Sequence, residues 1–451
     1  MKKRNTAFSS FMLFLIGTFA VTQVQVIGSI GISELFMYIA APFFFLTDLY
    51  KLRQNGFMPF LTFGLAVNIM CIVSSIYNDA PPIIMLKGFA ITYSLLAIPI
   101  CLHHYLSSNL NGLRWLMLGL ALTFVINIFV FQSATETTML AGGDTGGKAV
   151  DRIVSGPIFW IGRLRHFVTL PINGWFLDTP MGYSVFAPIL FAVFSMATSV
   201  SGRSNALAAI ASAAILFLGG KTRAKMLRIS RNLYVILIGA CLSIVVLNIV
   251  YKFTVRQGLL GEKALVKYEK QTRKGTGVLS LLMGGRMEAF LPLYAGLHKP
   301  WIGHGPHALD VYGYTEEYLF KYGAPEDYEE HMGFMRHYIR MGITPIGRIP
   351  AHSHITGFFM WFGIVGGAYW LYCLYLMGRY FKNDIAAIPQ WFGYLAGGAP
   401  LMLWNLFFSG LGYRIFTTLY FTAILLAHAV SKGWLELPFE MQKKIWEKER
   451  K

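Results

Sequence analysis

The sequence predicts an all-α fold: a polytopic membrane protein with about 12 transmembrane helices and one large, partly helical loop on the outer side. Of its 451 residues, 55% are hydrophobic and only 14% are charged. The mean hydropathy of +0.51 is too high for an ordinary soluble protein. The charges lie between apolar runs of about 20 residues, the length that crosses a hydrocarbon core of about 30 Å.

Three basic loops set the orientation of the helices. "KLRQNG" begins at Lys51, "HHYLSSNLNGLR" at His103 and "KTRAKMLRISR" at Lys221. Together with the N-terminal "MKKR", which precedes an apolar run that we interpret as an uncleaved first helix, they place the N-terminus in the cytoplasm. The apolar stretches expected to cross are 10–28, 32–50, 57–77, 83–102, 115–132, 181–200, 204–220, 232–252, 354–378, 390–409 and 412–430.

A further, irregular crossing is expected within residues 153–177, because the two halves of the chain otherwise disagree about sidedness. This segment carries Arg163, Arg165 and His166, which are costly against lipid and should face a cavity or water. The whole chain, 1–451, is then a single integral-membrane domain. The hydrophilic segment 252–351 forms its large outer loop, inserted between transmembrane helices 9 and 10.

The charge balance and the cysteines exclude some classes of function. The formal net charge is +17, but much of the Lys and Arg lies in short loops that orient the spans, so no nucleic-acid partner is expected. The remaining basic residues can attract lipid headgroups or phosphates. All four cysteines fall within apolar runs, which predicts neither a disulfide framework nor a zinc site.

Four short motifs mark candidate chemistry at the outer ends of the spans. Arg203 stands in "SGRSNAL", where its guanidinium can bind a phosphate bidentately or simply reach up to water. Arg286 stands in "GGRMEAF", after two glycines and before an amphipathic helix. The glycine-rich turn "KPWIGHGPH" follows Arg286, and "PAHSHITGFF" places His352 at the start of an apolar run. An imidazole titrates near neutral pH and can deprotonate a hydroxyl.

In the order and spacing of these motifs, the chain resembles the O-antigen ligase and polymerase superfamily of bacterial inner-membrane glycosyltransferases. Members commonly show an arginine turn opening a span, a Gly-Arg followed by an aromatic, a Pro-x-x-Gly-x-Gly, and a histidine with a glycine eleven residues later. The matching positions here are Arg203, Gly285-Arg286 with Phe290, "PWIGHG" at 300–305, and His352 with Gly363. Departures from the pattern are Ser353 for the usual Asn, Phe290 for Trp and Ser204 for Gly.

The resemblance implies a metal-independent enzyme without cofactors, multi-pass in the bacterial inner membrane, with its active site on the periplasmic side. It implies that Arg203, Arg286 and His352 are catalytic, and that a glycan moves from undecaprenyl pyrophosphate to an acceptor. Within the superfamily the pattern is most similar to the O-antigen ligases, which use lipid A-core in lipopolysaccharide biosynthesis. Polymerisation of O-antigen or exopolysaccharide and protein O-glycosylation are the other branches.

Several further residues are candidates for substrate binding, each with a plainer alternative. Lys87 can reach a phosphate or point its ammonium to water, and Arg414 lies in the outer turn between the last two spans. His354 competes with His352, and Glu288 can pair with Arg286 or act as a base. His304, His307 and Asp310 have spacing that could bind a metal, although loop histidines are commonly ordinary hydrogen-bonding residues. Arg163, Arg165 and His166, in the irregular crossing, are also candidates for substrate binding.

A transporter or flippase for lipid-linked sugar is the alternative from another class, because it too would place cationic residues inside the bundle. It predicts substrate contacts near the middle of the membrane. The enzyme interpretation instead predicts that Arg203, Arg286 and His352 converge outside the hydrocarbon.

Overall fold

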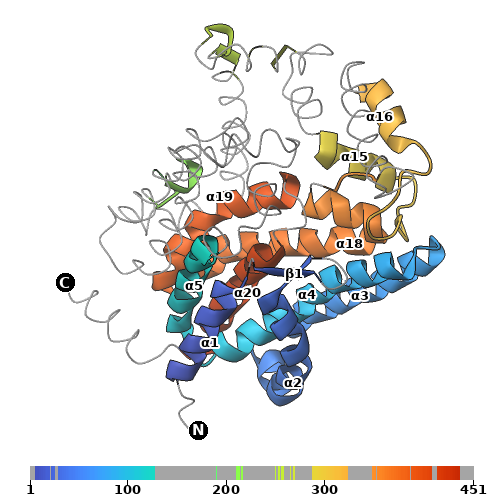
Figure 1. Ribbon diagram of the computed structural model, residues 1–451. Coiled ribbons are helices and arrows are strands. Elements are labelled where there is room, and N and C mark those ends of the chain that lie inside the picture. Colours follow the sequence, from blue (N-terminus) through green and yellow to red (C-terminus); the bar gives the residue numbers. More distant parts are fainter. Residues whose placement is uncertain are drawn as a thin grey trace.

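The computed structural model describes residues 6–126 apart from 21 and 26–28, short pieces between 189 and 269, residues 287–322, and residues 348–436 apart from 352, 386 and 409–413. These parts are mostly helical (Figure 1). The helices are α1 (Thr6–Thr18), α2 (Ile32–Gln54), α3 (Met58–Tyr77), α4 (Pro82–Leu106), η1 (Leu110–Gly112), α5 (Leu113–Ile126), α15 (Met287–Gly296), α16 (Tyr314–Tyr322), α18 (His354–Arg379), η3 (Tyr380–Asp384), η4 (Pro389–Trp391), α19 (Phe392–Phe408) and α20 (Arg414–Ser431).

Four of the helices within the described ranges are long and apolar enough to cross a membrane. They are α2, α3, α4, and α18 continued through η3. On α2 the side chains of Ile39, Phe43, Leu46 and Tyr50 recur at helical spacing and are 63–77% exposed. An exposed apolar stripe of this kind suits contact with lipid, and the chain is accordingly a membrane protein.

The first expected span, 10–28, is wrong as a continuous helix. Helix α1 ends at Thr18, and the chain then forms an antiparallel hairpin of β1 (Gln23–Gln25) and β2 (Ser29–Gly31), with Val24 opposite Ile30. The physical reason lies in the sequence "TQVQVIGSIG", where polar and apolar residues alternate and two glycines follow. Alternation with a period of two favours a strand over a helix.

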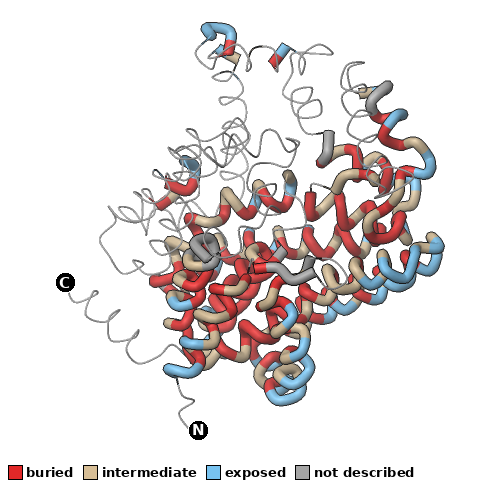
Figure 2. Tube along the Cα trace, viewed as in Figure 1, coloured by how far each residue is buried: buried red, intermediate tan, exposed pale blue. Residues whose placement is uncertain are grey.

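The buried core lies where α1, α4, α5, α18 and α20 meet, and Figure 2 shows this interior in red. Gly17 of α1 and Gly119 of α5 let these two helices approach closely, because a Cβ at Gly17 would overlap the carbonyl oxygen of Leu116. Small residues permit such close crossings in membrane bundles. The rings of Trp370, Tyr369 and Tyr420 are almost completely buried.

Two ends of the bundle can be told apart from the contacts. At one end, which we call the loop end, the C-terminus of α3 and the first half of α18 meet residues 299–306. At the other, the far end, the C-terminal parts of α2 and α4 meet through Asn55 and His103. The C-terminal part of α20 also meets η3 there through His428 and Asp384, and Trp434 beyond α20 covers Gly56 beyond α2.

Candidate functional site

Helix α18 is broken at Phe362 and Gly363, and the glycine-rich turn fills the break. Phe362 has φ −127° and ψ 15°, and Gly363 has φ 63° and ψ −155°, so the helical hydrogen bonds stop there. Glycine adopts a positive φ of this kind readily, because it has no Cβ. A Cβ on Gly363 would overlap the carbonyl oxygens of Trp301 and Pro300. Gly363, the glycine that stands eleven residues after His352, therefore lets the backbone of Pro300 and Trp301 pack against the break.

Backbone groups that the break leaves without helical partners are satisfied by the turn. The amide of His304 donates to the carbonyl oxygen of Met360 at 2.7 Å, and that of Gly305 donates to Trp361 at 3.0 Å. In return the amide of Ile364 donates to the carbonyl oxygen of Pro300 at 2.7 Å. Buried backbone groups are costly when unpaired, so these bonds hold the turn and the helix break in one geometry.

The C-terminal end of α3 clamps the same turn. The hydroxyl of Ser74 donates to the carbonyl oxygen of Trp361 at 2.9 Å. Asn78, the C-cap of α3, donates from Nδ2 to the carbonyl oxygen of Gly303 at 3.1 Å and accepts a 2.8 Å hydrogen bond from Nζ of Lys299 at Oδ1. Three segments far apart in the sequence are thus joined at the loop end: α3, the turn 299–306 and α18.

The residues on each side of His352 are held in place. Before it, the amide of Ile349 donates to the carbonyl oxygen of Ala308 at 3.0 Å. After it, Ser353 is the N-cap of α18: its Oγ accepts from the amide of Thr356 at 3.1 Å and donates to the carbonyl oxygen of Leu406 at 3.0 Å. Serine is a strong N-cap, and both bonds of its hydroxyl fix the start of α18.

The first turns of α15 and α18 touch each other. The hydroxyl of Thr356 donates to the carbonyl oxygen of Ala289 at 2.6 Å. Farther along, Gly296 of α15 lies against the ring of Phe359 so closely that a Cβ would meet the ring at 2.7 Å. The two helices whose N-terminal flanks carry the predicted arginine and histidine motifs therefore lie side by side (Figure 1).

His354 is completely buried between helices. Its Nδ1 lies 3.0 Å from the carbonyl oxygen of Asn405, and its ring meets the edge of Trp370 at a centroid distance of 4.8 Å. These contacts join α18 to α19 and orient the imidazole away from solvent. The packing gives His354 a structural role in this arrangement.

The other predicted substrate-binding residues are only partly placed. Lys87 is half-buried on α4, one residue before Gly88, which packs against Pro306 of the turn. Arg414 begins α20. Eight predicted positions lie outside the residues or side chains that the structure describes: Arg163, Arg165, His166, Arg203, Arg286, Glu288, His352 and the side chain of Arg414.

Two of the three residues with metal-binding spacing, His304 and Asp310, have hydrogen-bond partners, and the ring of His307 lies 5.1 Å from that of Trp361. His304 is buried and its Nε2 lies 2.8 Å from the carbonyl oxygen of Ala295. Asp310 caps α16, with its two carboxylate oxygens accepting from the amides of Tyr314 at 2.7 Å and Thr315 at 2.9 Å. Within the described part of the chain no group of three His, Cys, Asp or Glu side chains is arranged to hold a metal ion.

An aromatic cluster lies beside the turn and was not predicted from the sequence. The ring of Tyr294 is 5.8 Å from Tyr318 and 6.2 Å from Tyr322, and His298 is 4.7 Å from Tyr314. The hydroxyl of Tyr294 donates to Glu317, and this hydrogen bond raises the pKa of Tyr294 to about 12. The high density of tyrosine in 294–322 is the one hint that the sequence offers.

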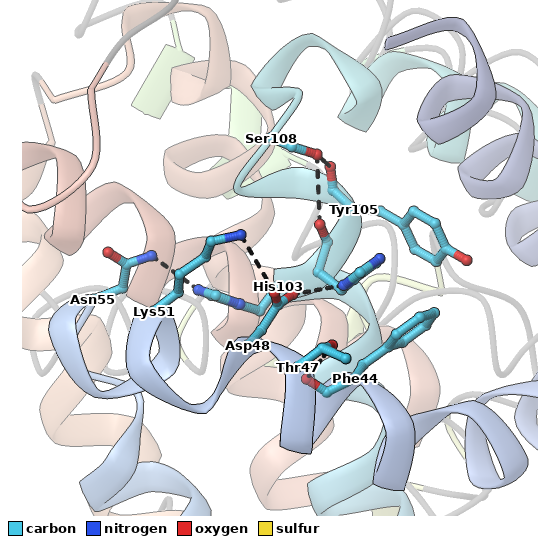
Figure 3. A network of polar contacts seen from close by, with 9 residues as sticks. Phe44, Thr47, Asp48, Lys51, Asn55, His103, Tyr105 and Ser108 are labelled. Carbon is cyan, nitrogen blue, oxygen red and sulfur yellow. Dashed lines mark hydrogen bonds and ion pairs between the residues drawn. The ribbon is translucent and has the colours of Figure 1, made fainter. Parts of the chain in front are cut away.

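A second polar cluster lies at the far end of the bundle (Figure 3). Asp48 of α2 is 2% exposed and pairs with His104 of α4 at 2.6 Å and with Lys51 at 3.3 Å. Phe44 stacks on the His104 ring at 3.8 Å, and Nδ2 of Asn55 lies 2.9 Å from Nε2 of His103. These contacts tie α2 to α4 and satisfy a carboxylate that would otherwise be buried alone.

Comparisons of the chain with protein-family models, with curated proteins and with solved structures gave no match.

Proposed function

We propose that this protein is a membrane glycosyltransferase that moves a glycan from undecaprenyl pyrophosphate to an acceptor at the periplasmic face of the bacterial inner membrane. The observation that carries the proposal is the contact between Thr356 and Ala289. Arg286 directly precedes α15, and His352 stands two residues before α18. Since consecutive Cα atoms are about 3.8 Å apart, this contact limits how far the arginine and the histidine can lie from one another.

The chemistry requires a leaving group, a nucleophile and a base. The acceptor hydroxyl attacks the anomeric carbon of the donor sugar, the bond from that carbon to the pyrophosphate oxygen breaks, and the hydroxyl proton passes to the imidazole of His352. Negative charge grows on the departing pyrophosphate. Arg203 and Arg286 would stabilise this charge with bidentate hydrogen bonds.

The arrangement of the loop end supports a donor that enters sideways from the bilayer. Lys87 and the turn 299–306 lie at the ends of spanning helices, where a lipid-linked headgroup would reside. In this proposal the loop end is periplasmic. Arg163, Arg165, His166 and Arg414 are further candidates for contact with the headgroup. His354 belongs to the supporting structure, since its ring is buried.

The acceptor separates the two branches of the proposal. An O-antigen ligase transfers the glycan to lipid A-core, whereas a polymerase transfers it to another lipid-linked repeat unit. The pattern of one histidine and two arginines favours the ligase, because it is most similar to that branch. Purified protein incubated with lipid-linked glycan, with and without lipid A-core, tells them apart: chains that lengthen without core indicate a polymerase.

The decisive experiment combines this transfer assay with three variants, Arg203→Ala, Arg286→Ala and His352→Ala. We expect each to lose at least a hundredfold of the transfer rate, the order expected for loss of a base or of an oxyanion contact. Arg256→Ala is the control, because Arg256 is an exposed arginine in the segment 252–351 that also contains Arg286. If wild-type protein forms no product but moves lipid-linked glycan across vesicle membranes, the protein is a transporter and the proposal is wrong.

A further inference from the structure

Lys299 occupies an unusual position at the loop end. Its Nζ lies 5.7 Å from the ring centroid of Tyr77 and 5.2 Å from that of Tyr312, and it donates a 2.8 Å hydrogen bond to Oδ1 of Asn78. The two tyrosines are 61% and 60% exposed. A lysine side chain is thus fixed between two open aromatic faces by contacts from α3 and from the loop.

The ammonium group of Lys299 has hydrogen-bonding capacity left for a ligand. It carries three N–H donors, and Asn78 accepts one of them. Among the described residues no carboxylate lies within 4.0 Å of it. The tyrosine rings attract the cation through their faces, but this attraction does not replace a hydrogen-bond acceptor. Fixing a flexible lysine costs side-chain entropy, and here no counter-ion from these residues offsets that cost.

The depth of this site in the membrane identifies the kind of acceptor. Tyr77 is the last residue of the spanning helix α3, and Asn78 is its C-cap. The end of a membrane-spanning helix lies at the level of the lipid headgroups, where tyrosine rings commonly gather. The ammonium of Lys299 is therefore held at the level of lipid phosphates.

The same lysine is coupled to the turn that fills the break in α18. Its carbonyl oxygen accepts a 2.9 Å hydrogen bond from the amide of Gly303, and the next residue, Pro300, accepts from Ile364. A phosphate bound to Lys299 would consequently lie beside the helix whose N-terminal flank carries His352. A lysine that only pointed its ammonium to water would need no such attachment.

We infer that Lys299, with Tyr77 and Tyr312 as its walls and Asn78 as its positioning residue, binds the phosphate of the lipid-linked sugar donor. The inference rests on the proposed function, which it deepens by adding a headgroup contact from the turn. The faces of Tyr77 and Tyr312 and the amide oxygen of Asn78 hold the ammonium at one position, so it is pre-organised for an anion.

The test measures binding of undecaprenyl pyrophosphate to the full-length protein in nanodiscs of phosphatidylcholine. Lys299→Met removes the ammonium and keeps the apolar stem, and we expect it to raise the Kd about tenfold or more, as for a hydrogen bond to a charged group. Lys321→Met is the matched control. Nζ of Lys321 also lies over two tyrosine rings, at 5.8 Å from Tyr294 and 5.5 Å from Tyr322, but on the exposed face of α16. This control should bind like the wild type.

A second arm replaces part of the phosphatidylcholine by phosphatidylglycerol, whose phosphate is not linked to a sugar carrier. Unchanged binding of the probe supports the inference. Competition that depends on Lys299 would show a general site for anionic lipids and overturn it, as would equal losses in Lys299→Met and Lys321→Met. An unfolding temperature like that of the wild type confirms that the variants fold.

The outcomes separate this inference from the proposed function. If Lys299→Met binds the probe as the wild type does while the wild type transfers glycan, the lysine site is wrong and the enzyme remains. If the wild type transfers nothing but binding still depends on Lys299, the enzyme is wrong and the lipid-phosphate site remains.

Discussion

The amide of Ile364 donates a 2.7 Å hydrogen bond to the carbonyl oxygen of Pro300, across the break in α18. The amides of His304 and Gly305 donate in the opposite direction, to the residues before the break. The turn and the helix therefore each satisfy backbone groups of the other. The shape of α18 at the loop end and the position of the turn are fixed together.

Replacing Gly363 with alanine should destabilise the protein. With φ 63° and ψ −155° it lies in a region that is essentially restricted to glycine, which costs alanine about 1–3 kcal/mol, and the added Cβ would also overlap the carbonyl oxygen of Trp301. Gly378→Ala in the same helix is the control, because a Cβ there meets nothing within 4 Å and alanine favours a helix. The apparent unfolding temperature of the purified variants measures both effects. Equal temperatures for the two variants would contradict the interlocked turn.

Ser74 and Ser75 are neighbours with different roles, and alanine variants should separate them. The Ser74 hydroxyl reaches across to the carbonyl oxygen of Trp361, whereas that of Ser75 bonds back to Cys71 in its own helix. We expect Ser74→Ala to cost about 1 kcal/mol and to speed hydrogen exchange of the amides in 303–305. Ser75→Ala should leave that exchange unchanged. Faster exchange in both variants would show that α3 as a whole, and not Ser74, holds the turn.

His304 should make stability depend on pH. Burial lowers its pKa below the ordinary 6.5, with Lys299 and His298 acting in the same direction and the contacts with Ala295 and Asp310 opposing them. The unfolded chain therefore takes up this proton at a higher pH than the folded chain. The corresponding stability is present above pH 6.5 and is lost as the pH falls through the lower pKa of the folded state.

Unfolding temperatures between pH 8 and pH 5 test this expectation. The His304→Gln variant should show a shallower decline toward low pH than the wild type, since it has no imidazole to protonate. His298→Gln, which changes an exposed histidine near the same turn, is the control. A decline that is as steep in His304→Gln as in the wild type would rule out His304 as its source.

Variants of the two neighbouring histidines should fail in different ways. His354→Ala removes a buried ring that contacts Asn405 and Trp370, and we expect a loss of about 2–3 kcal/mol in stability. His352→Ala should keep the unfolding temperature and lose glycan transfer. Measuring stability and transfer on both variants decides the assignment. Full transfer by His352→Ala would remove it from the proposed mechanism.

At the far end, His104→Ala should be more harmful than Lys51→Ala. The carboxylate of Asp48 is buried, and His104→Ala removes its 2.6 Å hydrogen bond, which costs about 1–3 kcal/mol. Lys51 is 38% exposed, so its pair with Asp48 contributes about 1 kcal/mol at most. Denaturation of the two variants gives the comparison directly. Similar losses would mean that the cluster is open to water.

The positions of the long apolar helices could be predicted from the sequence alone. Helices α2, α3, α4, α18, α19 and α20 begin and end within a few residues of the expected stretches, because apolar length and helical propensity are local properties. The motif pairs His352 with Gly363, but the break of α18 at this glycine was not predicted from it. Helix α1 ends earlier than the expected span 10–28. Residues 22–31 are apolar on average, and this average concealed the alternation of polar and apolar residues that favours the two strands.

The contacts between side chains could not be predicted from the sequence. Asp310 was a metal candidate by spacing, and it turned out to cap α16. The contact of His354 with the carbonyl oxygen of Asn405 on α19 likewise joins residues that are 51 positions apart. Asn78 and Lys299 are 221 positions apart, and nothing local in either stretch announces their hydrogen bond. Such pairings arise from how helices pack against one another, and the sequence encodes that packing only through the whole fold.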